Sequence, residues 1–277
     1  MASSSCIQGW SFVGCMRSSM PSGRRRRAVT LLALAAVGAA TVGSARAEET
    51  PRRLLFVGNS FTYYNGGLET HVKALAASAN PPRLIEADRA TQGGATLRVL
   101  HGKESIREKI RDGRYDVVIL QEDIPELPEH SPAPFFEFGR RFDEEIRAAG
   151  GKSLLFMAWP YERLGWVALP EIVEAHRELG RELNVPVAPV GLAFERAGRE
   201  HPEIPMLAAD REHETLQGTY LAACTIYATL FGENPQGYAY RPEGVTAAEA
   251  AALQRIAAET LQAWQQQPAP AAAGSAP

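Results

Sequence analysis

The stretch "LLFVGNSFTYYNGG", residues 54–67, leads from four apolar residues into Gly58-Asn59-Ser60 and then into aromatic side chains. A short apolar run that ends in glycine and passes into a helix-like segment is typical of a buried strand followed by a helix. Gly58 permits a tight turn at this junction. Ser60 then lies where strand meets helix, either as a nucleophile or as the residue that caps the helix.

The same alternation continues along the chain and predicts the fold class. Strand-like apolar runs occupy residues 53–58, 83–90, 116–121, 153–159 and 185–191. Apolar positions three to four apart predict helices at residues 66–79, 96–112, 134–149, 170–184, 215–231 and 246–264. This order predicts one three-layer α/β/α sandwich over residues 48–264, with a central, mostly parallel five-stranded sheet. Ligands bind such sheets at the carboxyl ends of the strands.

The first 47 residues have the pattern of an export signal. Four arginines, Arg24 to Arg27, precede the uncharged run Ala28 to Gly43, and a small-x-small cleavage pattern ends at Ala47. We expect cleavage after Ala47 and export to the periplasm or beyond, by the general or the twin-arginine route, with Met1 or Met20 as the start. The run is shorter than the roughly 20 residues of a spanning helix, so no stable membrane span is expected after cleavage.

The composition of the remaining chain limits its partners. The whole chain has a formal net charge of −3, and the leader holds six arginines and no acid, so the exported part carries −9. A surface of this sign repels phosphate backbones, and we expect no nucleic-acid binding. Only Cys224 lies outside the leader, which excludes an intramolecular disulfide. Residues 265–277 are Pro/Ala-rich and are expected to form a disordered tail.

Polar residues follow the second and third predicted strands. Gly93 and Gly94 precede a helix, where their amides either hold an anion or form an ordinary turn. Gln121 directly follows an apolar run and can donate a hydrogen bond into the mouth of the sheet. The acids that follow are expected to form a solvated loop and no metal site: Glu122, Asp123, Glu126 and Glu129.

A late stretch, "AADREHETLQGTYLAACTIYATLFG", places Asp210 and His213 three apart just before a helix. A carboxylate this close to an imidazole can fix its tautomer and stabilise the imidazolium, while the other ring nitrogen faces a nucleophile. An Asp-x-x-His pair alone is weak. Its occurrence after a first-strand serine, a second-strand glycine and a third-strand amide, in one α/β chain, is more specific.

At these residues the sequence resembles the SGNH (GDSL-type) hydrolase superfamily, most of all its bacterial branch whose first block reads Gly-Asn-Ser-Phe. The resemblance spans roughly residues 53–232 and implies a flavodoxin-like fold. It implies Ser60 as nucleophile and Asp210 and His213 as its partners. It also implies oxyanion donors at the amides of Ser60 and Gly94 (or Gly93) and at the Gln121 side chain. Asn59 replaces the aspartate of the GDSL pattern, and Gln121 replaces the third-block asparagine.

The resemblance implies an exported serine esterase or deacetylase that hydrolyses a carboxylic ester through an acyl-serine. It requires neither metal nor organic cofactor. Expected substrates are an O-acylated carbohydrate or a small ester. Asn59, Phe61, Tyr64, Trp159 and Tyr161 are candidates to line the substrate site, but core or rim packing is the better explanation for most of the aromatic residues. Two alternatives remain: an acyltransferase with the same triad, and a non-catalytic carbohydrate- or ester-binding module. The sequence specifies neither the acyl length nor the oligomeric state.

Overall fold

The computed structural model describes residues 50–123 and 131–267, so the predicted leader, its cleavage after Ala47, and residues 268–277 lie outside the described residues. Five strands form one sheet in the order β2-β1-β3-β4-β5, and every pairing is parallel. The strands are β1 (Arg53–Gly58), β2 (Glu86–Thr91), β3 (Val117–Gln121), β4 (Lys152–Phe156) and β5 (Val187–Ala188). The predicted parallel α/β/α fold is confirmed, with the flavodoxin-like strand order.

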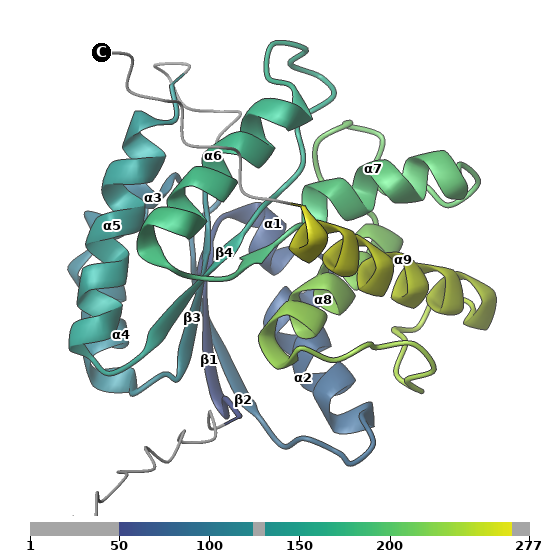
Figure 1. Ribbon diagram of the computed structural model, residues 1–277, viewed down its shortest axis with the longest axis horizontal. Helices are drawn as coiled ribbons and strands as arrows, with labels where there is room; N and C mark the ends of the chain where they lie inside the picture. Colours follow the sequence, from purple (N-terminus) through teal and green to yellow (C-terminus); the bar gives the residue numbers. More distant parts are fainter. Residues whose placement is uncertain (1–49, 124–130, 268–277) are drawn as a thin grey trace, which may run out of the picture. The chain divides into compact units, whose positions relative to one another are not determined.

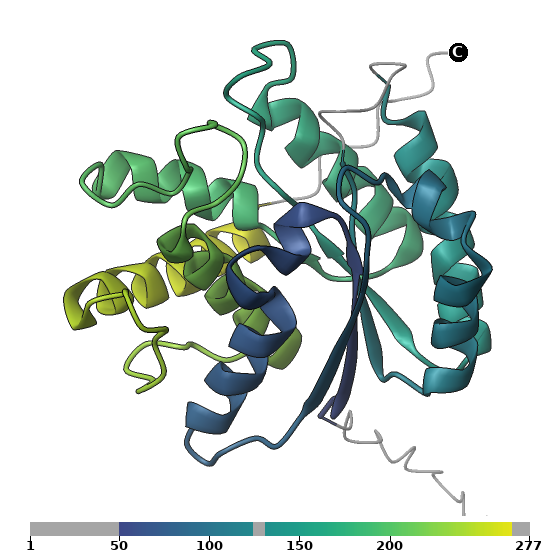
Figure 2. The same ribbon diagram turned by 180° about the vertical axis from the view of Figure 1, so that it is seen from behind.

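Helices cover both faces of the sheet (Figures 1 and 2). One layer contains α3 (Leu97–His101), α4 (Glu104–Gly113), α5 (Ala133–Ala148) and α6 (Leu169–Leu183). The other contains α2 (Leu68–Ser78), α7 (Val190–Glu200), α8 (Leu216–Phe231) and α9 (Ala247–Gln266). The short helix α1 (Ser60–Tyr63) and the 3-10 turn η1 (Tyr64–Gly66) connect β1 to α2.

Strand β1 lies at the centre of two hydrophobic cores. Leu54 and Phe56 pack with the α2, α8 and α9 layer, whereas Leu55 and Val57 pack with the α3 to α6 layer. All four side chains are fully buried. A strand that is buried on both faces needs a continuous apolar run, which is why residues 54–57 do not alternate with polar ones.

Several predicted elements differ from the structure, among them the second strand, which was predicted at residues 83–90 and runs from Glu86 to Thr91. The fifth strand is only Val187–Ala188, because Pro186 and Pro189 flank it and proline supplies no N–H to a ladder. Helix α7 begins at Val190 and was not predicted, because its first residues were assigned to that strand. The helix predicted at residues 96–112 is two helices, α3 and α4. Helix α9 runs to Gln266, two residues beyond the predicted domain end.

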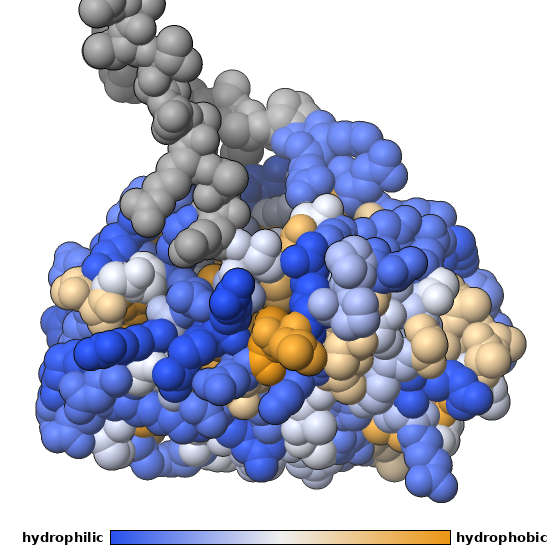
Figure 3. All heavy atoms as spheres, turned by 90° about the horizontal axis from the view of Figure 1, so that it is seen from below, coloured by the Kyte–Doolittle hydropathy of each residue, from blue (hydrophilic) through white to orange (hydrophobic). Residues whose placement is uncertain are grey.

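The face at the amino ends of the strands is mainly hydrophilic, with a compact hydrophobic group near its middle (Figure 3). Leu84, in the loop before β2, is 86% exposed and is the most exposed large apolar residue of the described part. No helix within the described residues is long and apolar enough to span a membrane.

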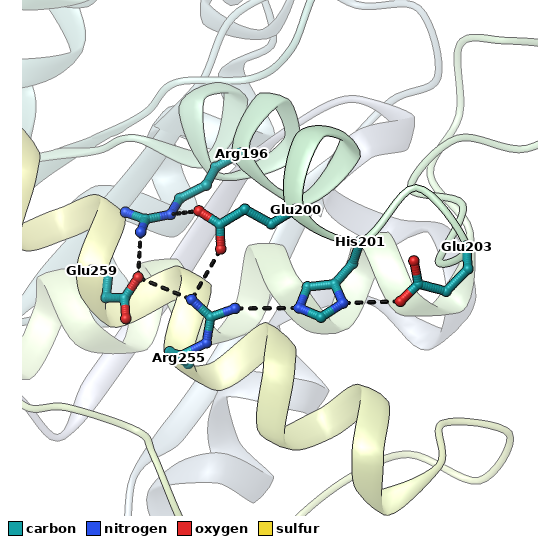
Figure 4. Close-up of polar contacts among 6 residues, drawn as sticks. All are labelled: Arg196, Glu200, His201, Glu203, Arg255 and Glu259. Carbon is teal, nitrogen blue, oxygen red and sulfur yellow. Dashed lines mark hydrogen bonds and ion pairs between the residues drawn. The ribbon is translucent and has the colours of Figure 1, made fainter.

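Charged residues join α7 to α9 (Figure 4). On α9, Arg255 Nη1 lies 2.9 Å from Glu200 and 3.0 Å from Glu259. On α7, Arg196 binds the same two carboxylates. The network extends through His201, which lies 3.2 Å from Arg255 Nη2 and 2.9 Å from Glu203. Two arginines thus share two carboxylates between the helices.

We expect Arg255→Met to lower the free energy of unfolding by about 1 kcal/mol, which corresponds to a melting temperature about 3 °C lower. The loss should shrink in 1 M salt, since these ion pairs are partly exposed. Differential scanning calorimetry at two salt concentrations measures both effects. Arg199→Met is the control, because Arg199 is exposed on α7 and forms no ion pair with the described residues. A salt-independent loss equal in both variants would contradict the network's role.

Candidate active site

Ser60 is the first residue of α1, directly beyond the carboxyl end of β1. A Cβ atom at Gly58 would lie 2.3 Å from Thr62 Oγ1 and 2.5 Å from Gln121 Oε1, so the turn requires glycine. The helix cap is Asn59, whose Oδ1 accepts from the Phe61 amide at 3.1 Å. The cap function considered for Ser60 therefore belongs to its neighbour, and the Ser60 hydroxyl is available for another contact.

The hydroxyl of Ser60 lies 2.9 Å from His213 Nε2, and His213 Nδ1 lies 2.8 Å from Asp210 Oδ2. Because a carboxylate only accepts, Nδ1 carries the proton, and Nε2 can accept from Ser60. The hydrogen bond from His213 is the main cause that lowers the pKa of Asp210, which keeps this carboxylate ionised at neutral pH. The structure thus brings together the three residues that the sequence proposed as a triad.

The loop that carries Asp210 and His213 is closed by local hydrogen bonds. Asp210 Oδ1 accepts from the amides of Glu212 and His213, both at 3.0 Å. An isolated antiparallel bridge pairs Leu207 with Glu214 at the two ends of the loop. Trp159 Nε1 donates to the Glu212 carbonyl at 2.9 Å, which ties the loop to the segment after β4. We call residues 207–214 the Asp-His loop.

The sequence predicted the backbone amides of Ser60 and Gly94 as oxyanion donors. Gly94 has φ +62°, and a Cβ placed on it would meet no atom within 4 Å. It lies in a turn that the Ala95 amide closes by donating to the Gln92 carbonyl at 3.2 Å. Within the described residues the amides of Ser60 and Gly94 donate to no protein acceptor. Both amides predicted as oxyanion donors are therefore unoccupied.

The predicted oxyanion role of Gln121 does not fit the geometry. Its side chain is fully buried. Its Oε1 accepts from the Asn59 amide at 2.8 Å and from Thr62 Oγ1 at 3.2 Å. Its Nε2 donates to the Glu122 carbonyl at 2.9 Å. Because both ends of the amide bind protein groups and the side chain is buried, Gln121 supports the turn that holds Ser60.

The predicted solvated acidic loop is also wrong in its first two residues, while Glu126 and Glu129 lie outside the described residues. Glu122 and Asp123 are 2% and 1% exposed. Glu122 Oε1 accepts from the amides of Asp123 and Leu97, and Asp123 Oδ1 accepts from Tyr161 at 2.5 Å. Burial raises the pKa of Glu122 to about 8. No cluster of three metal-ligating side chains occurs within the described ranges.

Most of the predicted substrate-lining residues belong to the core. Phe61 stacks on Trp159 with ring centroids 4.4 Å apart, and the edge of Tyr161 contacts Phe61. These three side chains and Asn59 are at most 3% exposed, so packing explains them. Tyr64 differs, because it is 38% exposed and stacks on the His213 ring at 4.4 Å.

The sequence did not reveal a cavity of about 480 Å³ beside the Asp-His loop. Ala208 and Arg211 of the loop line it together with Trp159 and Phe194. Neither Ser60 nor His213 lines it. Its residues come from segments 159–169, 191–198 and 202–211, which no local pattern connects.

The pH dependence of stability should reflect two buried acids. Burial raises the pKa of Glu122 and of Glu214 to about 8, from 4.5 in an exposed chain. Between these values the folded protein holds protons that the unfolded chain has released, so stability falls as pH rises toward 8. Burial lowers the pKa of His176 to about 4. Below about pH 6.5 this histidine therefore makes stability rise with pH, which opposes the effect of the two acids, and above that pH it has little effect.

We expect Glu214→Gln to reduce the decrease in unfolding free energy between pH 6.5 and 8 by an amount on the order of 1 kcal/mol per pH unit. Urea unfolding at pH 6.5, 7.25 and 8 measures the slope. Glu122→Gln should reduce it similarly, and the double variant should flatten it further. Unchanged slopes in all three variants would show that neither carboxyl is protonated in the folded protein.

No protein-family model matches the sequence, and a search of curated proteins finds no significant match. Solved structures share the fold, which is that of the SGNH hydrolases. A DUF4886 family protein from Bacteroides uniformis superposes with a TM-score of 0.59 at 17% identity, covering 79% of this chain and 98% of its own. A protein from Slackia heliotrinireducens assigned to the SGNH hydrolases superposes with a TM-score of 0.54 at 22% identity. The match covers 65% of this chain and 98% of that protein. An acetylxylan esterase from Geobacillus stearothermophilus superposes with a TM-score of 0.53 at 17% identity. The match covers 65% of this chain and 94% of that protein.

Proposed function

We propose that this protein is a serine esterase that hydrolyses a carboxylic ester through an acyl-serine intermediate. The observation that carries the proposal is the unbroken hydrogen-bond chain from Ser60 through His213 to Asp210. Its position at the carboxyl end of a parallel strand, where such sheets bind ligands, supports it. The fold shared with hydrolases of ester bonds is consistent with this chemistry. A complete, connected triad is not expected of a module that only binds.

In the proposed reaction His213 Nε2 removes the Ser60 proton as Oγ attacks the carbonyl carbon. The carbonyl π bond opens, and the amides of Ser60 and Gly94 bind the resulting oxyanion. His213 then protonates the leaving alcohol as the ester C–O bond breaks, which leaves Ser60 acylated. Water, deprotonated by His213, attacks the acyl-serine, and release of the acid returns the proton to Ser60. Asp210 stabilises the imidazolium in both halves.

We propose a small acyl ester, such as an O-acetylated carbohydrate, as the substrate, acted on outside the cytoplasm after removal of residues 1–47. The arginine-rich, apolar leader pattern supports export. The acetylxylan esterase of the same fold supports the acyl group. The exposed aromatic ring of Tyr64 beside the triad supports a sugar or another flat apolar group next to the ester.

The proposal is tested with the purified chain from Glu48, p-nitrophenyl acetate and phenylmethylsulfonyl fluoride. We expect ester hydrolysis that the sulfonyl fluoride abolishes, with one sulfonyl group found on the Ser60 peptide by mass spectrometry. Product analysis with a sugar acceptor present then separates hydrolysis from acyl transfer. Absence of both turnover and Ser60 labelling in the folded protein would overturn the proposed function.

A further inference from the structure

Two adjacent residues of η1 contact two adjacent residues of the Asp-His loop. The Tyr64 ring stacks on the His213 ring, with centroids 4.4 Å apart and planes inclined by 15°. The next residue, Asn65, donates from Nδ2 to the carbonyl of Glu214 at 3.1 Å. The same Nδ2 lies 2.8 Å from Thr219 Oγ1. The segment that bears the nucleophile therefore contacts the segment that bears the base at two points besides the Ser60 hydroxyl.

Asn65 is fixed through both its side chain and its backbone carbonyl. Its backbone has φ 50° and ψ 35°, a left-handed conformation that asparagine tolerates better than most residues. Its carbonyl accepts from His71 Nε2 at 2.9 Å, and His71 Nδ1 accepts from the Tyr240 hydroxyl at 2.8 Å. Asn65 is exposed, but Thr219 and Glu214 are 0% and 2% exposed. The side-chain amide of Asn65 therefore anchors a surface turn to the buried end of the Asp-His loop.

The imidazole of His213 is packed on more than one side. Tyr64 covers one face, and Phe61 meets the ring edge to face at 5.9 Å. In contrast, the side chain of Asp210 is 46% exposed, so its hydrogen bond to His213 lies in solvent-accessible surroundings. A hydrogen bond to a water-accessible carboxylate fixes a ring less firmly than packing does. An aromatic face above the ring also stabilises the imidazolium.

We propose that Tyr64 and Asn65 form a positioning clamp that holds His213 at hydrogen-bond distance from Ser60. The inference rests on the proposed function, because it assigns the clamp to that reaction. Ser60, Tyr64 and Asn65 belong to one short segment, so fixing this segment to the loop also fixes the distance from Oγ to Nε2. Neither clamp residue touches the reacting atoms, and both act through His213.

The test is Asn65→Gly, which permits the left-handed backbone but removes the Nδ2 donor. We expect kcat for p-nitrophenyl acetate to fall by about 10- to 100-fold with KM within about twofold, since a displacement near 1 Å can cost about 100-fold. Asn184→Gly is the matched control. Asn184 is an exposed asparagine with φ 53° at the end of α6, and its replacement should leave kcat unchanged.

A second pair of variants tests the ring. Tyr64→Phe keeps the stacked face and should retain kcat within about twofold, whereas Tyr64→Ala should lower kcat by about tenfold. If Tyr64→Ala and Asn65→Gly both turn over like the unmodified protein, the clamp is disproved. If Tyr64→Phe lowers kcat as much as Tyr64→Ala does, the hydroxyl and not the ring positions His213, and the stacking argument is wrong.

A readout that needs no turnover separates this proposal from the esterase proposal. The Nδ1 proton of His213, shared with Asp210, should give a downfield proton NMR resonance that Asp210→Ala abolishes. We expect Asn65→Gly to broaden or remove this resonance while Asn184→Gly preserves it. If the protein is inactive but Asn65→Gly removes the resonance, the esterase proposal fails, while the positioning of His213 by Asn65 is still supported. An active protein in which Asn65→Gly changes neither kcat nor the resonance would refute the clamp alone.

Discussion

Alanine at Ser60 or at His213 is expected to lower kcat/KM for p-nitrophenyl acetate by about 1,000-fold or more. Without the Ser60 hydroxyl no acyl-serine can form, and without His213 no other group among the described residues lies within hydrogen-bond distance to accept its proton. The two losses should not add in the double variant, because the residues act as one unit. Initial rates of the folded proteins, corrected for spontaneous hydrolysis, measure the effect.

Asp210→Ala provides the internal comparison. Its carboxylate orients the imidazole but does not touch the substrate, so its loss should be smaller than that of Ser60 or His213. It also removes the acceptor for two loop amides, and circular dichroism must show that the fold survives. Ser60→Ala with unmodified activity and unmodified sulfonyl labelling would place the nucleophile elsewhere and contradict the assigned triad.

Gln121→Leu is expected to lower the free energy of unfolding by about 3 to 5 kcal/mol. The substitution leaves the buried Asn59 amide, the Thr62 hydroxyl and the Glu122 carbonyl without their partner, and each unsatisfied buried group costs about 1 to 3 kcal/mol. Urea unfolding measures the loss. Activity should fall as well, since the turn between β1 and α1 carries Ser60.

Thr62→Val is the matched control for Gln121→Leu. It removes only the hydroxyl that donates to Gln121 Oε1, so we expect a loss of about 1 kcal/mol. The comparison also decides between two roles for Gln121. An oxyanion donor would lose kcat with little change in stability, as is usual for a group that acts on the transition state. That outcome would restore the role that the sequence resemblance implied and contradict the structural role argued from burial.

The prediction of the sheet was accurate where the strands are contiguous apolar runs. The run at residues 53–58 is β1 within the same bounds, and the runs at 116–121 and 153–159 contain β3 and most of β4. A buried parallel strand needs contiguous apolar residues, which a sequence displays directly. The prediction of the fifth strand failed because the run at 185–191 contains both β5 and the start of α7. The two prolines in this run were the signal that separates the two elements.

The candidate triad could also be predicted from the sequence, because Asp210 and His213 lie on one loop and Ser60 follows a strand whose end is predictable. The surroundings of the triad were not. Glu122 and Asp123 are polar neighbours in a charged stretch, which predicts exposure, yet both are buried. Phe61 and Trp159 follow strand ends, which predicts a binding site, yet they stack within the core.

Apolar periodicity and short spacings are local properties of the chain, so they were enough to predict the parallel α/β/α fold, the position of Ser60 after β1 and the pairing of Asp210 with His213 on one loop. Which other residues surround these three depends on the tertiary structure. Gln121 meets Asn59 and Thr62, and Asn65 meets Glu214 and Thr219, across separations of 59 to 154 residues. A hydrogen bond depends on distance and direction in space, and local sequence patterns do not encode these for residues that meet only after folding.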